Sequence, residues 1–416
     1  MRFYIETYGC TANKADESII KGAIKEKNHE IVKNIKDSDV IIILTCTVID
    51  TTQQRMISKI KSFKKTGKKL IVAGCMASIQ KDEIKKFAPN ALFLPPQYSD
   101  QILDLLKNGR IKEKKINKTK NTKDFENFSA PIAIAEGCMF NCSYCITTLA
   151  RGKLNSFPIN EIVKDIKNAV NMGCFEIQLT SQDTSSYGLD KKTNLGKLLL
   201  EIHKIKKDFK LRVGMMNPYT CNLNIDSIIN GFDDNKIYKF LHLPIQSGND
   251  NILELMNRKY KVNDAKNIIT KFREKYPDIT LSTDIIVAFP SETENQFEDT
   301  IKLIKNIKPD ITNITRYSAR PFTKAKHLKG RVKTEIAKKR SKILTDLCKE
   351  ISKEKNKKFI GKKFEIRIYQ KGKNKTFIAR NENYKPVVVN KKLKIGQKIN
   401  LEIIDYEVSY LVGSII

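Results

Sequence analysis

Three closely spaced cysteines are the feature that most constrains this chain. Cys138, Cys142 and Cys145 stand at Cys-x-x-x-Cys-x-x-Cys spacing, directly after the apolar run 131–135. Three thiolates on one short loop can bind three corners of an iron–sulfur cluster. Because no fourth ligand follows nearby in the sequence, one iron would stay open to a small molecule. The fold must therefore place this loop at the end of a strand, where its three thiols can bind a metal cluster.

Two other interpretations of these cysteines remain open. A zinc ion prefers four ligands and usually pairs a Cys-x-x-Cys with a second ligand pair. The sequence offers no second pair and contains only 4 histidines. Three unrelated buried thiols are the other alternative, but the regular spacing argues against them. We therefore place an iron–sulfur cluster ahead of both.

Residues 1–108 alternate between strand and helix patterns. The pattern predicts helices over 13–27, 52–65, 79–87 and 100–107. It predicts strands over 2–7, 40–45, 69–73 and 91–94. Buried aliphatic strands separated by helices are typical of a parallel sheet with helices on both faces. The fold class expected for this part is a doubly wound α/β sheet.

Each of the first three predicted strands is followed by a cysteine: Cys10, Cys46 and Cys75. The carboxyl ends of parallel strands lie along one edge of a sheet, where ligand sites form. These cysteines, far apart in sequence, should therefore converge and hold a second cluster. The alternative is that each is a small buried residue at a strand end.

Residues 130–332 contain six further strand patterns, near 132 and over 175–180, 211–215, 240–244, 281–289 and 311–317. Six βα units predict a partial (βα)6 barrel with its site at the carboxyl ends of the strands. The cysteine loop follows the first of these strands. Polar residues at the same position after later strands are candidate cofactor contacts: Ser181, Gln182, Asp183, Asn217, Gln246 and Ser247.

The rest of the chain is strongly basic. Residues 109–129 form a polar linker, either solvated or in contact with phosphates, and 333–356 form a connecting helix with an apolar stripe. Residues 357–416 show five short strands, which suits a small all-β, oligonucleotide-binding-type barrel. Fourteen Lys/Arg and five Asp/Glu occur from Lys357 onward, interleaved with aromatics. Phosphate neutralisation and base stacking together hold single-stranded RNA.

The whole chain has a net charge of +31, which suits a polyanionic partner such as nucleic acid, although a biased genome would also raise the lysine content. No apolar stretch is long enough for a signal peptide or a membrane span. We expect a cytoplasmic protein whose cysteines are ligands rather than disulfides.

At full length the sequence resembles the radical S-adenosylmethionine (SAM) methylthiotransferases, which join an amino-terminal three-cysteine cluster domain, a radical-SAM barrel and a carboxyl-terminal TRAM RNA-binding domain. Several segments resemble the archaeal and eukaryotic branch that acts on N6-threonylcarbamoyladenosine (t6A) in tRNA: 8–13, 45–48, 179–184, 212–218 and 316–318. One segment differs, because Phe322 stands where relatives often have glycine.

The resemblance implies two 4Fe-4S clusters, an auxiliary one on Cys10, Cys46 and Cys75 and a SAM-binding one on the later trio. It implies conversion of t6A beside the anticodon into its 2-methylthio derivative. The partners would be tRNA, an electron donor and a sulfur source, without membrane or DNA. The alternatives are isopentenyladenosine in tRNA, an aspartate of a ribosomal protein, or a non-catalytic, metal-bound RNA-binding protein.

Overall fold

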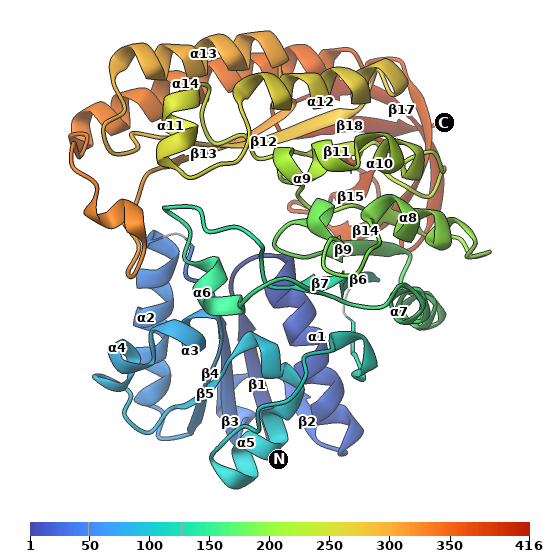
Figure 1. Cartoon of the computed structure of the whole chain (residues 1–416). Coiled ribbons are helices and arrows are strands. Elements are labelled where there is room, and N and C mark those ends of the chain that lie inside the picture. Colours follow the sequence, from blue (N-terminus) through green and yellow to red (C-terminus); the bar gives the residue numbers. More distant parts are fainter. Residues whose placement is uncertain (49, 126–127) are drawn as a thin grey trace.

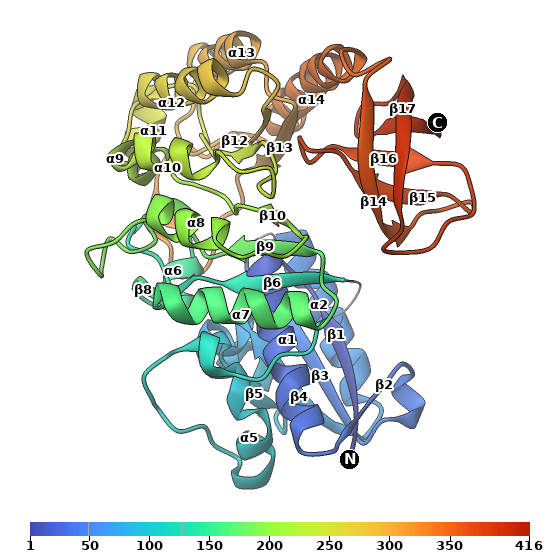
Figure 2. The same ribbon diagram turned by 90° about the vertical axis from the view of Figure 1, so that its right-hand side faces the viewer.

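The computed structural model describes residues 1–48, 50–125 and 128–416. An N-terminal sheet, a middle barrel and a C-terminal barrel follow one another along the chain (Figure 1). Figure 2 shows the C-terminal barrel beside the middle barrel, joined to it through the long helix α14 (Thr334–Lys357). In the part of the chain described, no helix is long and apolar enough to cross a membrane.

The N-terminal sheet is wholly parallel, in the order β2-β1-β3-β4-β5. Its strands are β1 (Arg2–Thr7), β2 (Glu30–Val32), β3 (Val40–Thr45), β4 (Lys69–Gly74) and β5 (Leu92–Leu94). The central strand β3 is buried along its whole length, as a strand covered on both faces must be. The doubly wound fold is confirmed. Strand β2 was not predicted, because three half-exposed residues give too short a pattern.

Helices cover both faces of this sheet. One apolar core joins the sheet to α1 (Thr11–Glu26) and α5 (Ile102–Asn108). The other joins it to α2 (Asp50–Lys64), α3 (Cys75–Ile79) and α4 (Lys81–Lys85). The helix predicted over 79–87 is confirmed only for α4. The preceding helix α3 was not predicted, because it begins directly after β4 and is separated from α4 by a backbone break at Gln80 (φ −125°, ψ 26°).

The middle barrel contains the six predicted strands in two parallel sheets, β10-β9-β6 and β11-β12-β13. They are β6 (Ser129–Ala133), β9 (Glu176–Thr180), β10 (Lys210–Arg212), β11 (Phe240–His242), β12 (Thr280–Val287) and β13 (Ile311–Arg316). Two backbone hydrogen bonds, from Leu211 to Lys236 (2.7 Å) and from Met216 to His242 (2.8 Å), join the two sheets. The partial barrel is confirmed.

Amphipathic helices surround this barrel. They are α7 (Ile159–Asn171), α8 (Leu195–His203), α9 (Pro218–Leu223), α10 (Ile225–Gly231), α11 (Asp250–Leu255), α12 (Val262–Lys275) and α13 (Glu294–Ile307). A short antiparallel pair, β7 (Ala135–Glu136) with β8 (Asn155–Ser156), was not predicted. It brackets the cysteine loop and the following helix α6 (Thr147–Arg151).

The C-terminal barrel is closed in the order β14-β15-β16-β18-β17 and confirms the five predicted strands. They are β14 (Lys363–Lys371), β15 (Phe377–Arg380), β16 (Pro386–Val389), β17 (Lys398–Tyr406) and β18 (Leu411–Ile415). The turn between β15 and β16 docks at the amino-terminal ends of the middle-barrel strands. There the Lys239 amide donates to Glu382 (2.8 Å), and the Asn383 amide side chain donates to Asp278 (2.8 Å).

The aromatic residues of this barrel are largely covered. Phe377 lies in the barrel core, and Tyr384 packs between barrels, with its ring 4.8 Å from Tyr238 and 4.9 Å from Phe240. Lysines, rather than these rings, dominate the exposed surface of the C-terminal barrel.

Neither alternative for the predicted linker, solvated or in contact with phosphates, holds for two of its lysines. Lys118 forms ion pairs with Asp16 and Glu136, and Lys123 forms one with Asp165. Both lysine side chains are buried, so this stretch is packed against the body rather than free in solvent. The predicted linker 109–129 also includes residues 126–127, which lie outside the described residues.

Candidate metal centres and cofactor contacts

The loop of Cys138, Cys142 and Cys145 is held tightly between β7 and α6. The Ser143 amide donates to Met256 (3.0 Å) and its hydroxyl to Leu255 (2.7 Å), which ties the loop to α11. Gly137 adopts a φ of 80°, and a Cβ there would lie 2.1 Å from the Lys153 carbonyl oxygen. A side chain cannot fit at that approach, so the entry to the loop requires glycine.

Each thiol of this loop accepts a hydrogen bond from an N–H group. Phe140 N donates to Cys138 Sγ (3.5 Å), Thr147 N donates to Cys145 Sγ (3.4 Å), and Arg258 Nη1 donates to Cys142 Sγ (3.5 Å). Hydrogen bonds to cluster sulfurs help to set reduction potentials. Three sulfurs, each with its own donor, are a donor set that fits thiolate ligation.

Burial and crowding raise the pKa values of two of these thiols, Cys138 and Cys142. Burial raises the pKa of Cys138 to about 12, with smaller contributions from Asp183, Cys145 and Cys142. The Cys142 pKa is also raised by burial, and the Arg258 charge opposes that rise. Without a cation the thiols of Cys138 and Cys142 therefore keep their protons, which a bound metal would displace.

The thiols of Cys10, Cys46 and Cys75 converge at the carboxyl edge of the N-terminal sheet. Cys10 precedes α1, Cys46 follows β3, and Cys75 is the first residue of α3. Burial raises the pKa of Cys75 to about 12; the charges of Cys46 and Cys10 add to the rise, and Arg151 opposes it. The strand order reverses beside β1, and ligands of such sheets bind at that point.

Among the described residues, no group of three or more His, Cys, Asp or Glu side chains is arranged to hold a metal ion. A single zinc ion would draw its thiolates to within about 2.3 Å of one centre. In a four-iron cluster each thiolate binds a different iron, so the sulfurs stand farther apart. Thiols are the ligands that such clusters take, so the donor type of both trios fits a cluster, and their ligand roles remain predictions.

Two of the predicted cofactor contacts have polar atoms that need a partner. Ser181 Oγ and Gln182 Oε1 are buried and find no hydrogen-bond partner within the described chain. Buried polar atoms are nearly always paired in native proteins. Both residues follow β9, at the same end of the barrel as the cysteine loop. A polar cofactor bound there would supply the missing hydrogen-bond partners.

Asp183 and Asn217 are occupied by the protein itself. Asp183 Oδ1 accepts from the Asn217 amide (3.0 Å), and Oδ2 accepts from the Thr220 hydroxyl (2.6 Å). Asn217 Oδ1 accepts from the Tyr219 amide (3.0 Å) and caps α9. Both residues therefore shape the loops around the site, and direct contact with a cofactor stays a prediction.

The remaining predicted contacts follow β11. Gln246 adopts a φ of 76°, which is unusual for a side chain of its size, and its amide donates to Asp284 (2.8 Å). Ser247 is fully buried, and its hydroxyl accepts from the Asn249 amide (3.3 Å). Ser247 thus supports the turn into α11, and neither cofactor role has been tested.

The sequence analysis did not identify three charged residues that lie at these sites. Arg258 lies against Cys142, and Arg151 lies against Cys75. Lys118 is buried with the carboxylates Asp16 and Glu136. Arg258 has no sequence signal, since 116 residues separate it from its partner thiol. Arg151, six residues after Cys145, was the most accessible of the three to sequence reasoning.

Phe322, which differs from the resembled family, has a φ of 63° and a side chain that is 71% exposed. Glycine adopts such a φ without cost, whereas a bulky residue is strained there. The neighbouring residue Arg320 donates to Gln53 of α2, so this loop reaches the N-terminal sheet.

Three family models match the chain in sequence order. Residues 2–94 match the uncharacterized protein family UPF0004, residues 132–304 match the radical SAM superfamily, and residues 357–416 match the TRAM domain. The first match contains Cys10, Cys46 and Cys75, and the second contains the other trio. Each match falls on one of the three structural parts.

One structural neighbour is the radical SAM methyltransferase TsrM from Kitasatospora setae, with cobalamin and a [4Fe-4S] cluster bound. Its TM-score is 0.58 at 10% identity, covering 78% of this chain and 76% of that one. At this identity the likeness supports the fold alone.

Full-length relatives are more informative. A probable threonylcarbamoyladenosine tRNA methylthiotransferase from Archaeoglobus fulgidus is 41% identical over 100% of this chain and 99% of its own length. A tRNA-2-methylthio-N(6)-dimethylallyladenosine synthase from Thermosipho melanesiensis is 31% identical over 100% and 99%. The ribosomal protein uS12 methylthiotransferase RimO from Thermotoga petrophila is 32% identical over the whole of both chains. The chain therefore belongs to the radical-SAM methylthiotransferase family of enzymes.

Proposed function

We propose that this enzyme converts N6-threonylcarbamoyladenosine next to the tRNA anticodon into its 2-methylthio derivative. The observation that carries the proposal is the pairing of two three-cysteine groups on adjoining parts of one chain. Helix α6, which follows the second trio, packs against α3, which begins with Cys75. One trio would serve radical generation and the other sulfur delivery.

The cofactors of the proposal are two 4Fe-4S clusters and SAM, which when bound supply a hydrogen-abstracting radical, a sulfur atom and a methyl group. Cys138, Cys142 and Cys145 would hold one cluster, and Cys10, Cys46 and Cys75 the auxiliary one. Ser181 and Gln182 would pair their free polar atoms with SAM. Arg258 would orient Cys142 and offset its negative charge.

The proposal includes a division of labour along the chain. Residues 1–108 would hold the auxiliary cluster, 130–332 the SAM-binding cluster, and 357–416 would bind RNA. An electron donor and a sulfur source are needed as further partners. The cytoplasm, where tRNA is available, is the proposed place of action.

The choice of substrate among related reactions is supported by similarity. The relative named for threonylcarbamoyladenosine is 41% identical, against 31% and 32% for those named for dimethylallyladenosine and ribosomal protein uS12. The target base lies in an anticodon loop, where it is unpaired and readily presented to an enzyme.

Nucleoside mass spectrometry tests this function directly. Reconstituted protein, SAM, a reductant and tRNA bearing t6A would be incubated without oxygen, and the nucleosides analysed. A methylthio product on t6A is the expected result. If 5′-deoxyadenosine forms without that product, while isopentenyladenosine tRNA or ribosomal protein is modified instead, the substrate assignment is wrong. A colourless, zinc-loaded protein would overturn the enzyme assignment.

Exposed lysines around the turn between β14 and β15 offer a test of the proposed RNA-binding surface. Lys371, the last residue of β14, and Lys373 and Lys375 of the turn are exposed, and none of the three forms an ion pair within the described chain. Replacing all three with alanine should weaken tRNA binding by about tenfold or more and reduce the salt dependence of the affinity, since each phosphate contact adds about 0.7 to the slope for single strands. Filter binding across a salt series measures both.

The matched control replaces three exposed lysines of α14, Lys338, Lys339 and Lys342, with alanine. Equal loss of affinity in both variants would mean a general charge effect rather than a binding surface. Deletion of 357–416 is a poorer test, because it would uncover Tyr238 and Phe240 of the middle barrel.

A further inference from the structure

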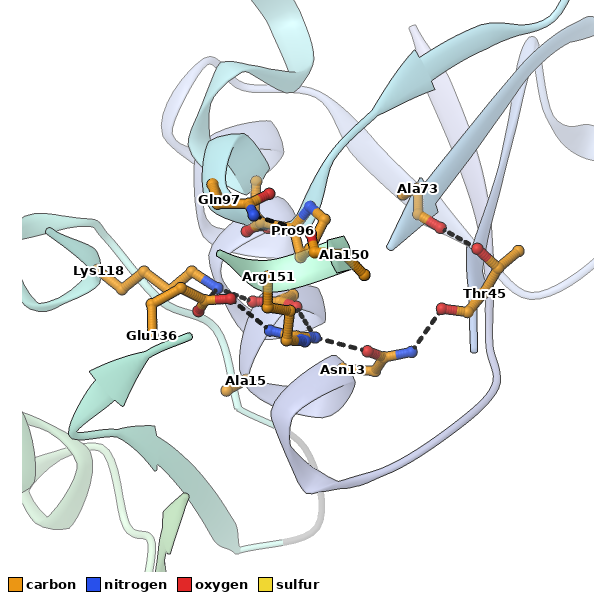
Figure 3. Close-up of polar contacts among 12 residues, drawn as sticks. Asn13, Ala15, Thr45, Ala73, Pro96, Gln97, Lys118, Glu136, Ala150 and Arg151 are labelled. Carbon is orange, nitrogen blue, oxygen red and sulfur yellow. Dashed lines mark hydrogen bonds and ion pairs between the residues drawn. The ribbon is translucent and has the colours of Figure 1, made fainter. Parts of the chain in front are cut away.

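One buried polar network connects segments that lie beside the two three-cysteine sites, and Figure 3 shows the part of it around Arg151. At its centre is Arg151, the last residue of α6. Its guanidinium donates to Glu136 Oε1 from Nη1 (2.8 Å), and from Nη2 to Asn13 Oδ1 (2.8 Å) and Asp16 Oδ2 (2.8 Å). Lys118 donates to Glu136 Oε2 (2.6 Å) and to Asp16. The network thus spans α1, the segment before β6, β7 and α6.

Asn13 carries the network onward to the loops of the N-terminal cysteines. Its side-chain amide donates to the carbonyl oxygens of Tyr8 (2.7 Å) and Thr45 (2.9 Å), which lie two and one residues before Cys10 and Cys46. The Thr45 hydroxyl in turn donates to Ala73 (2.6 Å) and accepts from the Met76 amide (3.2 Å), on either side of Cys75. All three loops are therefore tied to Arg151.

At its other end the network is tied to the second trio. Glu136 lies two residues before Cys138, and the Cys138 amide donates to the Gly152 carbonyl directly after Arg151 (3.0 Å). A neighbouring hydrogen bond also joins the N-terminal sheet domain to α6: the Gln97 side chain donates to the Ala150 carbonyl (2.8 Å). Both trios are thus linked to the same rigid group.

The cost of burying this network argues against a purely stabilising role. The side chains of Asp16, Lys118, Glu136 and Arg151 are each at most 3% exposed. Removing ions from water has a penalty that their attraction often fails to offset, and apolar contacts would stabilise an interface as well or better. Charged groups with directional hydrogen bonds instead restrict the two packed parts to a single relative geometry.

We propose that Arg151 and Asn13 are positioning residues that fix the separation and orientation of the two three-cysteine sites. The inference rests on the proposed function, in which sulfur bound at one site must reach a base activated at the other. The carboxylates of Asp16 and Glu136, with Lys118, hold the Arg151 guanidinium in place. The network acts on the distance between the sites, not on the ability of either trio to bind iron.

Two variants separate this role from general stability. Asn13→Ala cuts the ties to Tyr8 and Thr45 while keeping every charge. Arg151→Met with Glu136→Gln removes one cation and one anion together, leaving the Lys118–Asp16 pair. The matched control is Arg340→Met with Glu292→Gln, because Arg340 Nη1 and Glu292 Oε2 form an equally buried pair (2.9 Å) between α14 and the loop before α13.

The primary readout is electron paramagnetic resonance of the doubly reduced holoenzyme, which needs no RNA. The magnetic interaction between two paramagnetic clusters falls steeply with distance, so its splitting reports their separation. We expect the splitting to be altered or lost in both test variants and unchanged in the control. Iron and sulfide content should stay at the wild-type level in Asn13→Ala and in the control, whereas the double variant also removes the contact of Arg151 with Cys75. A second readout is the ratio of 5′-deoxyadenosine to methylthio product, which should rise by about 10- to 100-fold in the test variants.

Three results would overturn the proposal. The first is wild-type splitting in Asn13→Ala, and the second is an equal change of the splitting in the control. The third is loss of iron from Asn13→Ala, which would mean that the network supports the cluster ligands rather than fixing the separation of the two sites. If the double variant does not fold, Asn13→Ala alone decides. If the wild-type enzyme forms no methylthio product, the proposed substrate is wrong. The spectroscopic test of the separation between the two sites remains valid, because it needs no RNA.

Discussion

Cys142→Ala is expected to abolish the formation of 5′-deoxyadenosine from SAM. Cys142 is one of three thiols on the loop between β7 and α6 and accepts a hydrogen bond from Arg258. Alteration of groups that merely support a metal ligand already costs about 10- to 100-fold in affinity or activity. Loss of a ligand should therefore cost more than about 100-fold, and chromatography of the reaction products measures it.

The control for this prediction is Cys348→Ala. Cys348 is a buried thiol of α14 that packs in the middle-barrel core, away from both trios. This variant should lose some thermal stability while forming 5′-deoxyadenosine at close to the normal rate. Wild-type amounts of 5′-deoxyadenosine from Cys142→Ala would remove Cys142 from the cluster.

Cys75→Ala should separate the two halves of the reaction. The middle barrel and its thiols stay intact, so 5′-deoxyadenosine should still form at a rate within about twofold of normal. The methylthio product should fall by more than about 100-fold, because the cluster proposed to deliver sulfur would lose a ligand. Iron analysis should show the loss of about half of the bound iron, since one of two four-iron clusters is affected.

Cys174→Ala is the matched control for Cys75→Ala. Burial raises the pKa of the Cys174 thiol to about 11, and it lies between α7 and the amino-terminal end of β9, at the opposite end of that strand from the predicted site. Both products should form normally in this variant. A methylthio product at wild-type levels from Cys75→Ala would show that the N-terminal trio is not the sulfur source.

The sequence predicts much of the fold because strand ends in parallel sheets share an edge. Cys10, Cys46 and Cys75 could be grouped from that rule alone, without knowledge of any contact between them. The short strand β2 was not predicted, because its three residues give too short a pattern. Nor was the division between α3 and α4, which depends on the non-helical backbone of Gln80. Local patterns do not record such abrupt junctions.

The contacts between parts were beyond sequence reasoning. Arg151 and Asn13 are separated by 138 residues, and their hydrogen bond exists only because two independently patterned parts dock. Lys118 stands in a polar, basic stretch that any composition rule would place in solvent. Its burial depends on Asp16 and Glu136, which come from two different parts of the chain.

The turn between β15 and β16 has a consequence for biosynthesis. The Lys385 side chain reaches Asp310 (2.7 Å) at the amino-terminal end of β13, and Tyr384 covers rings of the middle barrel. Since these residues follow the middle barrel in the chain, the amino-terminal end of that barrel stays uncovered until they have been synthesised and folded. A nascent or prematurely terminated chain would expose apolar surface there and become a substrate for chaperones and proteases.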